Sequence, residues 1–429
     1  MKTNFLNPEM ERMSRAQLTA LQQERLIRMI RYTAANNAFH RERYRRAGID
    51  PETFRGIEDM PRVPMMSKTD FRDQYPDGMC CVPKKRIVEM HQSSGSTGTP
   101  VVMLYTMNDI RVWGECVGRC YRMAGAEPGD VLQITPTLGL FNGGLGCFHG
   151  GRAAEMFIVP ASSGNTVRQI KLINDFQTKV LVAVVSYGSR IMEVAEEMKV
   201  KMPSLKIGIF GAEAFSDGMK EKLRNGLGID VFDVYGMTET GGIGTLGQDC
   251  PEHCGIHLWE DHFYVEVIDP ATGEILPDGR EGELVVTSLS SEAIPVIRFR
   301  TGDLTSVISR ETCACGRTHL RLAPITARRD DMIIIKGVNC FPKQIEQSLL
   351  KVKGVLPNYQ ILLDEVNGVT NMHIKVEAEP GVTGYMVEKQ LKEDLGFSPG
   401  GEVLPPGFLP RQEGKAKRVF RLKNGVPVA

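Results

Sequence analysis

The chain has 429 residues, enough for a large domain with a substantial core and a smaller attached module. Its composition is that of an ordinary soluble globular protein, and its 52 basic and 52 acidic side chains cancel, so no overall field recruits nucleic acid or an anionic membrane. The amino terminus has no apolar core of signal-peptide length, and no apolar run could span a bilayer, so we expect a cytoplasmic protein. Its ten cysteines are therefore expected to be reduced thiols, and clusters of them are candidates for metal binding.

The first predicted element is a helix within the segment 24–46. Leu26, Met29, Ile30 and Ala34 recur there at helical spacing, which predicts an amphipathic helix with one apolar face. The seven arginines of the segment are expected to lie on its solvated surface, and we do not interpret them as a nucleic-acid patch.

A loop of small residues follows at 92–100 and runs into an apolar strand. It reads Gln-Ser-Ser-Gly-Ser-Thr-Gly-Thr-Pro. Hydroxyl groups, and backbone N–H groups that glycine leaves accessible, suit phosphate oxygens, although a simple turn between two strands is the alternative interpretation. The nucleotide-triphosphatase loop is excluded because Thr99, not lysine, follows Gly98.

Residues 179–240 alternate between strand-like and helix-like pieces. Strands are predicted at 180–185, 205–210 and 231–235, and helices at 191–200 and 217–225. Continuous apolar strands separated by helices predict a parallel sheet that is covered on both faces. Two strand ends carry unusual residues, Phe210-Gly-Ala-Glu213 and Tyr235-Gly-Met-Thr-Glu-Thr-Gly241, at the edge where such sheets collect ligands.

The remainder of the chain predicts an antiparallel section followed by a compact module. Strands at 262–268 and 283–287 flank turn-rich segments. After about residue 331 we expect helices at 342–351 and 385–395 and strands at 359–364 and 371–376. The predicted fold class is therefore α/β, with a large domain at 1–329 and a small, mobile α+β domain at 330–429.

Six segments in chain order are similar to the motifs of one enzyme superfamily. They are Ser93–Pro100, Phe210–Glu213, Tyr235–Thr240, Arg300–Asp303, Ile325–Asp331 and Gly414–Arg418. Together they resemble the adenylate-forming acyl-CoA synthetases, and within them the phenylacetate-coenzyme A ligase family, over essentially the whole chain. The resemblance implies ATP-dependent joining of an acid to coenzyme A through an acyl adenylate, with release of AMP and pyrophosphate.

The resemblance also implies roles for the nucleotide-binding residues. The serine-rich loop, Ser93, Ser94, Gly95, Ser96, Thr97 and Gly98, would hold the β and γ phosphates. Glu239 would bind Mg²⁺, for which a carboxylate oxygen is a suitable ligand, and Thr238 would contact the α-phosphate. The adenine would be held by Gly211, Ala212, Glu213, Tyr235, Gly236 and Met237, and the ribose by Asp303 with Arg328.

Lys415 matches the family's lysine that stabilises charge during adenylation, and Asp330 matches its hinge. Two positions depart from the family pattern. Ala327 replaces the usual glycine of the hinge motif, and Thr99 replaces a lysine that relatives often carry in the phosphate loop. The second departure removes one positive charge near the pyrophosphate.

Cysteines and histidines gather in two segments, around Cys250-Pro-Glu-His-Cys-Gly-Ile-His257 and around Cys313-Ala-Cys315. Cys250, His257, Cys313 and Cys315 are predicted to form a tetrahedral zinc site, and the resembling family includes members that carry a similar set of cysteines and histidines. Cys254 and His253 compete for these four places, and free thiols are the alternative. With four protein ligands, the site would be structural. The other cysteines, Cys80, Cys81, Cys116, Cys120, Cys147 and Cys340, are expected to be packed as small apolar residues.

The acid-binding pocket is expected to involve Phe141, which lies in a segment that resembles the family's pocket lining. Further candidates are Tyr187, Gly188, Ala212 and Gly236. The leading substrate is phenylacetate or a related aryl acid, with ATP, Mg²⁺ and coenzyme A as the other partners, and a homodimer by analogy. Two alternatives stay open: transfer of the acyl group to a carrier-protein phosphopantetheine, and a catalytically inactive, zinc-stabilised nucleotide-binding protein.

Overall fold

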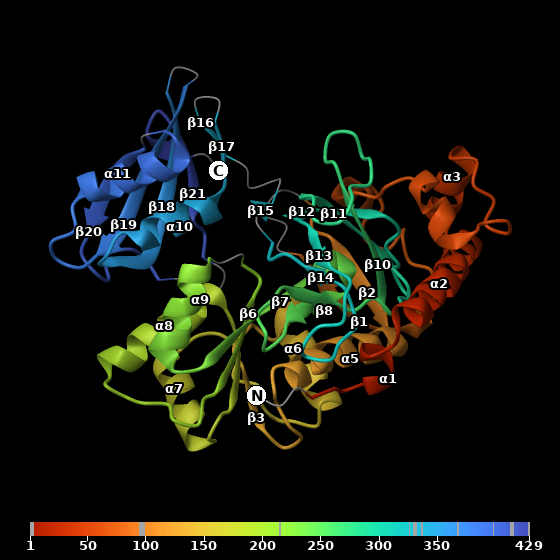
Figure 1. Ribbon diagram of the computed structural model, residues 1–429, viewed down its shortest axis with the longest axis horizontal. Helices are drawn as coiled ribbons and strands as arrows, with labels where there is room; N and C mark the ends of the chain where they lie inside the picture. Colours follow the sequence, from red (N-terminus) through yellow and green to blue (C-terminus); the bar gives the residue numbers. More distant parts are fainter. Residues whose placement is uncertain are drawn as a thin grey trace. The chain divides into compact units, whose positions relative to one another are not determined.

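A computed structural model describes residues 4–93, 99–213, 216–325, 327–328, 333–335, 338–366, 369–397, 399–411 and 416–427. The chain forms two compact units. The first comprises Met1–Ala183, Met202–Ala212 and Phe232–Pro324, and the second comprises Val184–Lys201, Glu213–Val231 and Ile325–Ala429. Figure 1 traces the elements of both units along the chain.

The first unit begins with helices that cover part of its core. They are α1 (Pro8–Glu11), α2 (Arg15–Asn36), α3 (Ala38–Arg46), η1 (Gly56–Arg62), α4 (Lys68–Asp73) and η2 (Lys84–Arg86). Helix α2 starts at a capping box in which the side chains of Ser14 and Gln17 satisfy each other's backbone N–H groups. The predicted apolar face is confirmed, because Leu26, Met29 and Ile30 are all buried.

A hairpin and a helix pair follow. Strands β1 (Ile87–Gln92) and β2 (Val102–Thr106) pair antiparallel, and α5 (Met107–Met123) starts directly after them. Helices α5 and α6 (Asn142–Ala153) lie side by side (Figure 1). Glycine makes this close approach possible, since a Cβ atom on Gly146 would lie 2.2 Å from the Trp113 ring.

A nine-stranded sheet forms the centre of the first unit, in the order β13-β14-β9-β8-β7-β6-β5-β3-β4. Its strands are β3 (Val131–Ile134), β4 (Phe157–Val159), β5 (Val180–Val184), β6 (Ile207–Gly211), β7 (Asp230–Met237), β8 (Gly242–Asp249), β9 (Ile256–Leu258), β13 (Val307–Ser309) and β14 (Arg321–Leu322). Strand β3 is parallel to β4 and β5, whereas β7, β8, β9, β14 and β13 pair antiparallel in succession. The three strands predicted at 180–235 are thus confirmed as neighbours in one sheet. Helix α7 (Thr166–Asp175) connects β4 to β5.

The antiparallel section is also confirmed. Strand β10 (Phe263–Ile268) pairs antiparallel with β11 (Gly282–Ser288), which pairs antiparallel with β12 (Phe299–Thr305). Both faces of β11 are covered, since all seven of its residues are buried. A short strand, β15 (Ala327–Arg328), follows at the start of the second unit's last segment.

The second unit combines two helices from the middle of the chain with the carboxy-terminal region. Its helices are α8 (Val185–Glu197), α9 (Asp217–Leu227), α10 (Pro342–Lys351) and α11 (Gly384–Leu395). Strands β20 (Gly400–Leu404), β19 (Val369–Ala378), β18 (Val355–Val366), β21 (Val419–Lys423) and β22 (Val426–Pro427) form one sheet in that order, and β16 (Ile333–Ile335) pairs with β17 (Val338–Cys340). Figure 1 shows α10 and α11 beside β18 and β19.

One helix boundary was predicted wrongly. The sequence predicts a helix at 191–200, whereas α8 begins at Val185 and ends at Glu197. Its first turns contain Val185, Tyr187 and Gly188, residue types that are weak helix formers. These residues are buried, so tertiary packing stabilises helical turns that propensity alone does not favour.

Within the residues that the structure describes, no helix is both long and apolar enough to cross a membrane.

Candidate active site and metal cluster

The first residue of the serine-rich loop, Ser93, is hydrogen-bonded to Val101, the residue that follows the loop. The backbone N–H of Ser93 donates to the Val101 carbonyl at 2.9 Å, and the N–H of Val101 donates to the Ser93 hydroxyl at 2.9 Å. These bonds join the two ends of the segment 94–100 at the open end of the β1–β2 hairpin. Ser94, Gly95, Ser96, Thr97 and Gly98 lie outside the described residues, so their predicted contacts stay predictions.

The predicted Thr238–Glu239 pair lies in a tight turn attached to this hairpin. Both residues belong to η3 (Thr238–Thr240), and Glu239 is buried. Gly241 follows with a φ of +103°, a conformation that glycine adopts without strain, and its carbonyl accepts a bond of 3.2 Å from the Tyr105 hydroxyl on β2. The hairpin that leads into the serine-rich loop and the turn that carries Glu239 are therefore held together.

A lysine lies next to this turn, and the sequence motifs assigned it no role. The Nζ atom of Lys68, at the start of α4, is 4.0 Å from the Glu239 carboxylate oxygen Oε1. The proximity of Lys68 to Glu239, more than 170 positions further along the chain, depends on the fold. The structure thus places a cation beside the turn that carries Glu239.

Tyr235 and Asp303, predicted to contact adenine and ribose, are brought together from separate sheets. The Tyr235 hydroxyl on β7 donates to Asp303 Oδ2 on β12 at 2.7 Å. The N–H of Asp303 donates to the Thr301 hydroxyl at 3.0 Å, which fixes the backbone beside the carboxylate. Both side chains are largely buried, so this hydrogen bond is shielded from solvent.

The end of strand β6 adopts an unusual backbone conformation. Ala212 has a φ of +65°, which costs a residue with a Cβ atom on the order of 1 kcal/mol or more and is common at ligand sites. Gly211, just before it, has no room for a side chain, since a Cβ atom would lie 2.6 Å from the Val234 carbonyl oxygen. Gly236 is equally constrained, because its Cβ atom would lie 2.2 Å from the Gly242 carbonyl oxygen. Met237 ends strand β7.

Several predicted residues belong to the second unit. Glu213 accepts a bond from the Ser186 N–H at 2.9 Å and another from the Ala416 N–H at 2.6 Å. The residue after Lys415 is therefore bonded to the residue that ends the Gly211-Ala212-Glu213 motif. Arg328 lies on β15, whereas Lys415 and Asp330 lie outside the described residues.

The candidates for the acid pocket differ in exposure. Phe141, the residue before α6, is 48% exposed and is available to contact a ligand. Tyr187 and Gly188 are buried in α8 of the second unit. These three assignments stay predictions.

The Tyr235–Asp303 bond permits a direct test of the nucleotide site. In Tyr235→Phe, the buried Asp303 carboxylate loses a donor, and we expect the KM for ATP to rise about five- to ten-fold, together with a loss of about 1–3 kcal/mol of fold stability. Tyr121→Phe is the matched control, because the Tyr121 hydroxyl donates to the Cys147 carbonyl in the core at 3.0 Å. It should lower the melting temperature and leave the KM for ATP unchanged. An unchanged KM in Tyr235→Phe would remove Asp303 from the nucleotide site.

The cysteine and histidine side chains form a buried cluster in the first unit. One possible ligand atom from each of Cys250, His257, Cys313 and Cys315 lies within 4.8 Å of the others, and all four residues are buried. Cys315 Sγ lies 3.4 Å from His257 Nε2, and Cys250 Sγ lies 3.8 Å from Cys313 Sγ. These are the four residues that the sequence predicts, and three thiols with one imidazole are a donor set typical of structural zinc.

The surroundings orient the cluster. The other ring nitrogen of His257, Nδ1, lies 3.2 Å from the His319 carbonyl oxygen and donates to it, so Nε2 carries the free lone pair that points toward Cys315. A tight turn holds the two thiols of the Cys-x-Cys segment, since the Gly316 N–H donates to the Cys313 carbonyl at 2.8 Å.

Both competitors for the metal have other contacts. Cys254 Sγ lies 2.8 Å from an Arg321 nitrogen, although it is also 3.6 Å from Cys313 Sγ. His253 Nδ1 lies 3.0 Å from Asp249 Oδ2. Of the cysteines expected to pack as apolar residues, Cys81, Cys116, Cys120, Cys147 and Cys340 are buried and Cys80 is half-buried.

Comparison with known proteins agrees with this geometry. The AMP-binding enzyme family matches residues 21–290, and the AMP-binding enzyme C-terminal domain matches residues 337–423. A phenylacetate-coenzyme A ligase of Thermus thermophilus is 41% identical over 97% of this chain and 99% of that ligase. The phenylacetate-coenzyme A ligase of Escherichia coli is 37% identical over 99% of this chain and 100% of the ligase.

Solved structures have the same fold. A 2-hydroxyisobutyryl-CoA ligase in complex with an acyl-AMP, in its postadenylation state, matches 96% of this chain and 91% of its own with a TM-score of 0.90 and 26% identity. The full-length relatives and the two matched domain families lead to one conclusion: the chain belongs to the AMP-binding enzyme family, in which its relatives are phenylacetate-coenzyme A ligases.

Proposed function

We propose that the chain joins an aryl carboxylic acid of the phenylacetate type to coenzyme A, at the expense of ATP and through an acyl adenylate. The observation that carries the proposal is the grouping, in the first unit, of the hairpin that ends at Ser93, the Glu239 turn and the Tyr235–Asp303 pair. Phosphate, cation and ribose contacts are the three requirements of a nucleotide site, and each of these elements supplies groups suited to one of them.

The first half-reaction forms a bond between a carboxylate oxygen and the α-phosphorus of ATP while the bond from that phosphorus to pyrophosphate breaks. Negative charge increases around the phosphorus, so catalysis depends on donors and cations that are already in place. Lys415 would neutralise charge on the carboxylate and the α-phosphate, and Thr238 would donate to the α-phosphate. In the second half-reaction, the thiol of coenzyme A attacks the acyl carbon and AMP leaves.

Glu239 is suited to hold Mg²⁺. The ion prefers carboxylate and phosphate oxygens, and it supplies charge neutralisation to the phosphates when bound. Glu239 is buried beside the Lys68 ammonium group, so its carboxylate is held in one place before the nucleotide arrives. Lys68 contributes a positive charge beside the Glu239 turn.

The substrate class rests on the relatives. Ligases named for phenylacetate match this chain over nearly its whole length, at 37 to 41% identity. Phe141 is the side chain best suited to contact an aromatic ring, because it is exposed and follows directly after the Leu138-Gly-Leu segment. Transfer of the acyl group to a carrier protein would use the same first half-reaction. It differs from ligation to coenzyme A only in the thiol that accepts the acyl group.

We further propose that Cys250, His257, Cys313 and Cys315 hold a structural zinc ion. The donor set and the orientation of His257 support this assignment. Four protein ligands leave no place for a substrate or a catalytic water, so the ion would stabilise the loops around β9 and β14 without taking part in the reaction.

The experiment is to follow AMP release from ATP, Mg²⁺ and coenzyme A with a panel of aryl acids. We expect AMP and pyrophosphate to form with arylacetates and the rate to depend on coenzyme A. Acid-dependent pyrophosphate exchange without turnover on free coenzyme A would favour a carrier-protein acceptor. Silence in both assays across the panel would contradict the enzymatic proposal.

A further inference from the structure

We propose that His91 is a positioning residue for adenylation: as an imidazolium held by Glu89, it links the strand that leads into the serine-rich loop to the segment that carries Phe141. The proposal rests on the proposed function, and it names a residue for which neither the sequence motifs nor the family resemblance gives a role. It follows from the contacts of one buried side chain.

His91 lies two residues before Ser93 on β1, and it is almost fully buried, with 1% of the residue exposed. Its Nδ1 atom lies 3.1 Å from the Leu140 carbonyl oxygen, and its Nε2 atom lies 2.7 Å from Glu89 Oε1. A carbonyl oxygen and a carboxylate can only accept hydrogen bonds, so both ring nitrogens must carry a proton to donate. The geometry therefore calls for a charged imidazolium at this position.

Glu89 is able to supply the counter-charge. Its two carboxylate oxygens lie 3.1 and 3.2 Å from Nε2 of His149 on α6, in addition to the contact with His91. Burial raises the pKa of Glu89, but hydrogen bonds from His149 and His91 outweigh burial and lower this pKa to about 2. The carboxylate is thus charged at neutral pH and is shared by two imidazole rings.

The Leu140 carbonyl is the second hydrogen-bond partner of the His91 ring. It accepts from His91 Nδ1 and also from the Gln92 backbone N–H at 3.1 Å, so two consecutive residues of β1 hold it. Leu140 directly precedes Phe141, the candidate for the acid pocket, and Gln92 directly precedes Ser93 at the base of the serine-rich loop. A shift of the His91 ring would therefore move the bases of both segments together.

Aromatic neighbours hold the ring in this orientation. His91 packs edge-on against Tyr105 and Trp113, with centroid distances of 5.6 and 5.5 Å, and these two rings stack on each other. The Trp113 Nε1–H donates to the Ile243 carbonyl at 3.1 Å, and Tyr105 donates to Gly241, so the same cluster extends to the Glu239 turn. Burial raises the pKa of Tyr105, so its hydroxyl stays neutral. Two other titratable groups face the ring: Glu89 contacts His91 directly, and His149 contacts the Glu89 carboxylate.

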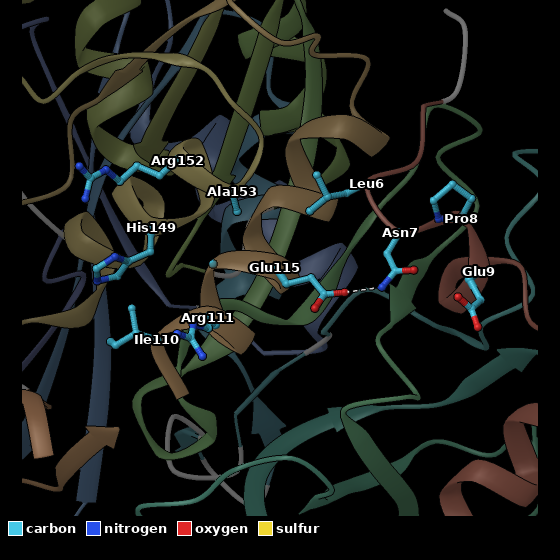
Figure 2. A pocket seen from close by; sticks show the side chains of 11 residues that line it. Leu6, Asn7, Pro8, Glu9, Ile110, Arg111, Glu115, His149, Arg152 and Ala153 are labelled. Atoms are coloured by element: carbon cyan, nitrogen blue, oxygen red, sulfur yellow. Dashed lines mark hydrogen bonds between the residues drawn. The ribbon is translucent and has the colours of Figure 1, made fainter. Parts of the chain in front are cut away.

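His149 connects this cluster to solvent. It is one of the side chains that line an open groove of about 710 Å³, together with Leu6, Asn7 and Glu115 (Figure 2). Its side chain is 17% exposed, compared with 1% for His91. Water in the groove can therefore exchange protons with the buried pair through His149.

Two substitutions of His91 test its two hydrogen bonds, to Glu89 and to the Leu140 carbonyl, separately. Glutamine can place its amide nitrogen near the position of Nε2, so His91→Gln keeps a donor to Glu89 and loses the donor to Leu140. Asparagine can place its amide nitrogen near the position of Nδ1, so His91→Asn keeps the donor to Leu140. We expect His91→Gln to raise the KM values for ATP and for the acid together, each about ten-fold, and His91→Asn to raise both about three-fold or less.

The matched control is His373→Gln. His373 also pairs with a glutamate, Glu402, at 3.5 Å, but its side chain is 44% exposed and lies in the second unit. Both KM values should stay at the wild-type level in this variant. If His91→Gln lowers the melting temperature but leaves both KM values unchanged, the residue is only structural, and a rise in one KM alone contradicts the link. Either result overturns the proposal.

A spectroscopic test needs no turnover, and its decisive measurement is made on the wild-type protein. In ¹⁵N-histidine-labelled wild-type protein at neutral pH, we expect the two ring nitrogens of His91 to show the matching shifts of an imidazolium, and Glu89→Gln to convert them to those of a neutral ring. A neutral tautomer in the wild type would overturn the proposal. Because this measurement does not depend on the acid, it separates failure of the His91 assignment from failure of the proposed reaction.

Discussion

Lys415→Ala is expected to slow formation of the acyl adenylate by about a hundred- to a thousand-fold, the usual effect of removing one group that stabilises charge in a transition state. Thioester formation from preformed acyl adenylate and coenzyme A should stay within about three-fold of the wild type, because the charge on the α-phosphate no longer increases in that step. The two rates are measured separately, by pyrophosphate release and by thioester formation.

The chain offers a close control for this experiment. Lys417 lies two residues further along the same basic segment, and its Nζ atom is 5.3 Å from the centroid of the Phe420 ring, so it already has a structural contact. Lys417→Ala should leave adenylation nearly unchanged. Equal losses in the two half-reactions of Lys415→Ala would contradict the view that the carboxy-terminal module pivots at Asp330 and presents Lys415 to the first step only.

Loss of the metal is expected to have the largest effect on stability. In Cys315→Ser the cluster keeps only three good ligands, and we expect zinc to be lost and the first unit to be destabilised by about 5 kcal/mol or more. The measurement combines the zinc content of the purified protein with its thermal or denaturant unfolding. Treating the wild type with a strong chelator should reproduce the same loss of stability.

Cys120→Ser separates this effect from the general cost of changing a buried cysteine. Cys120 is buried outside the cluster, and its thiol donates to the Cys116 carbonyl at 3.4 Å, a bond that a serine hydroxyl can also form. We expect this variant to keep its zinc and to lose about 1 kcal/mol. The zinc proposal is contradicted if the wild-type protein contains no zinc and the two variants are equally stable. The cluster would then consist of unliganded thiols.

The contacts around the cluster explain why the effect should extend beyond its loop. Arg317 is fully buried and donates to Glu11 at 2.8 Å, and its Nη1 atom lies 3.9 Å from Cys315 Sγ. Thr318 and His319 bond the backbone of Met13 and Met10. The loop that supplies two thiols therefore also holds the amino-terminal segment, and disorder in that loop would leave the charges of Arg317 and Glu11 poorly compensated.

The sequence predicted much of the local structure. Helix α10 has the predicted bounds, 342–351, because a proline in the first turn and an amphipathic pattern are local signals. The sequence underestimated β18 and β19, which are twelve and ten residues long, since alternating strands lack sharp end signals. The start of α8 depends on burial of Tyr187 and its neighbours, for which no local pattern exists.

The active-site candidates divide in the same way. Tyr235, Glu239 and Asp303 could be chosen from the sequence because each lies in a short motif with a chemical requirement that few residue types meet. The structure adds what no motif contains: the Tyr235–Asp303 bond, the Lys68–Glu239 contact and the contacts of His91. The Tyr235–Asp303, Lys68–Glu239 and His91–Leu140 pairs join residues that are 49 to more than 170 positions apart, and such contacts are decided by the packing of the sheets and helices.

The sequence by itself determined the family, the candidate residues for the nucleotide site and the six possible metal ligands, because these depend on local composition and on the chemistry of single side chains. Only the tertiary structure decided which four of the six converge, and which buried groups share a counter-charge. The physical reason is that convergence and burial are properties of distant chain segments packed together, whereas a motif records only the order of neighbours.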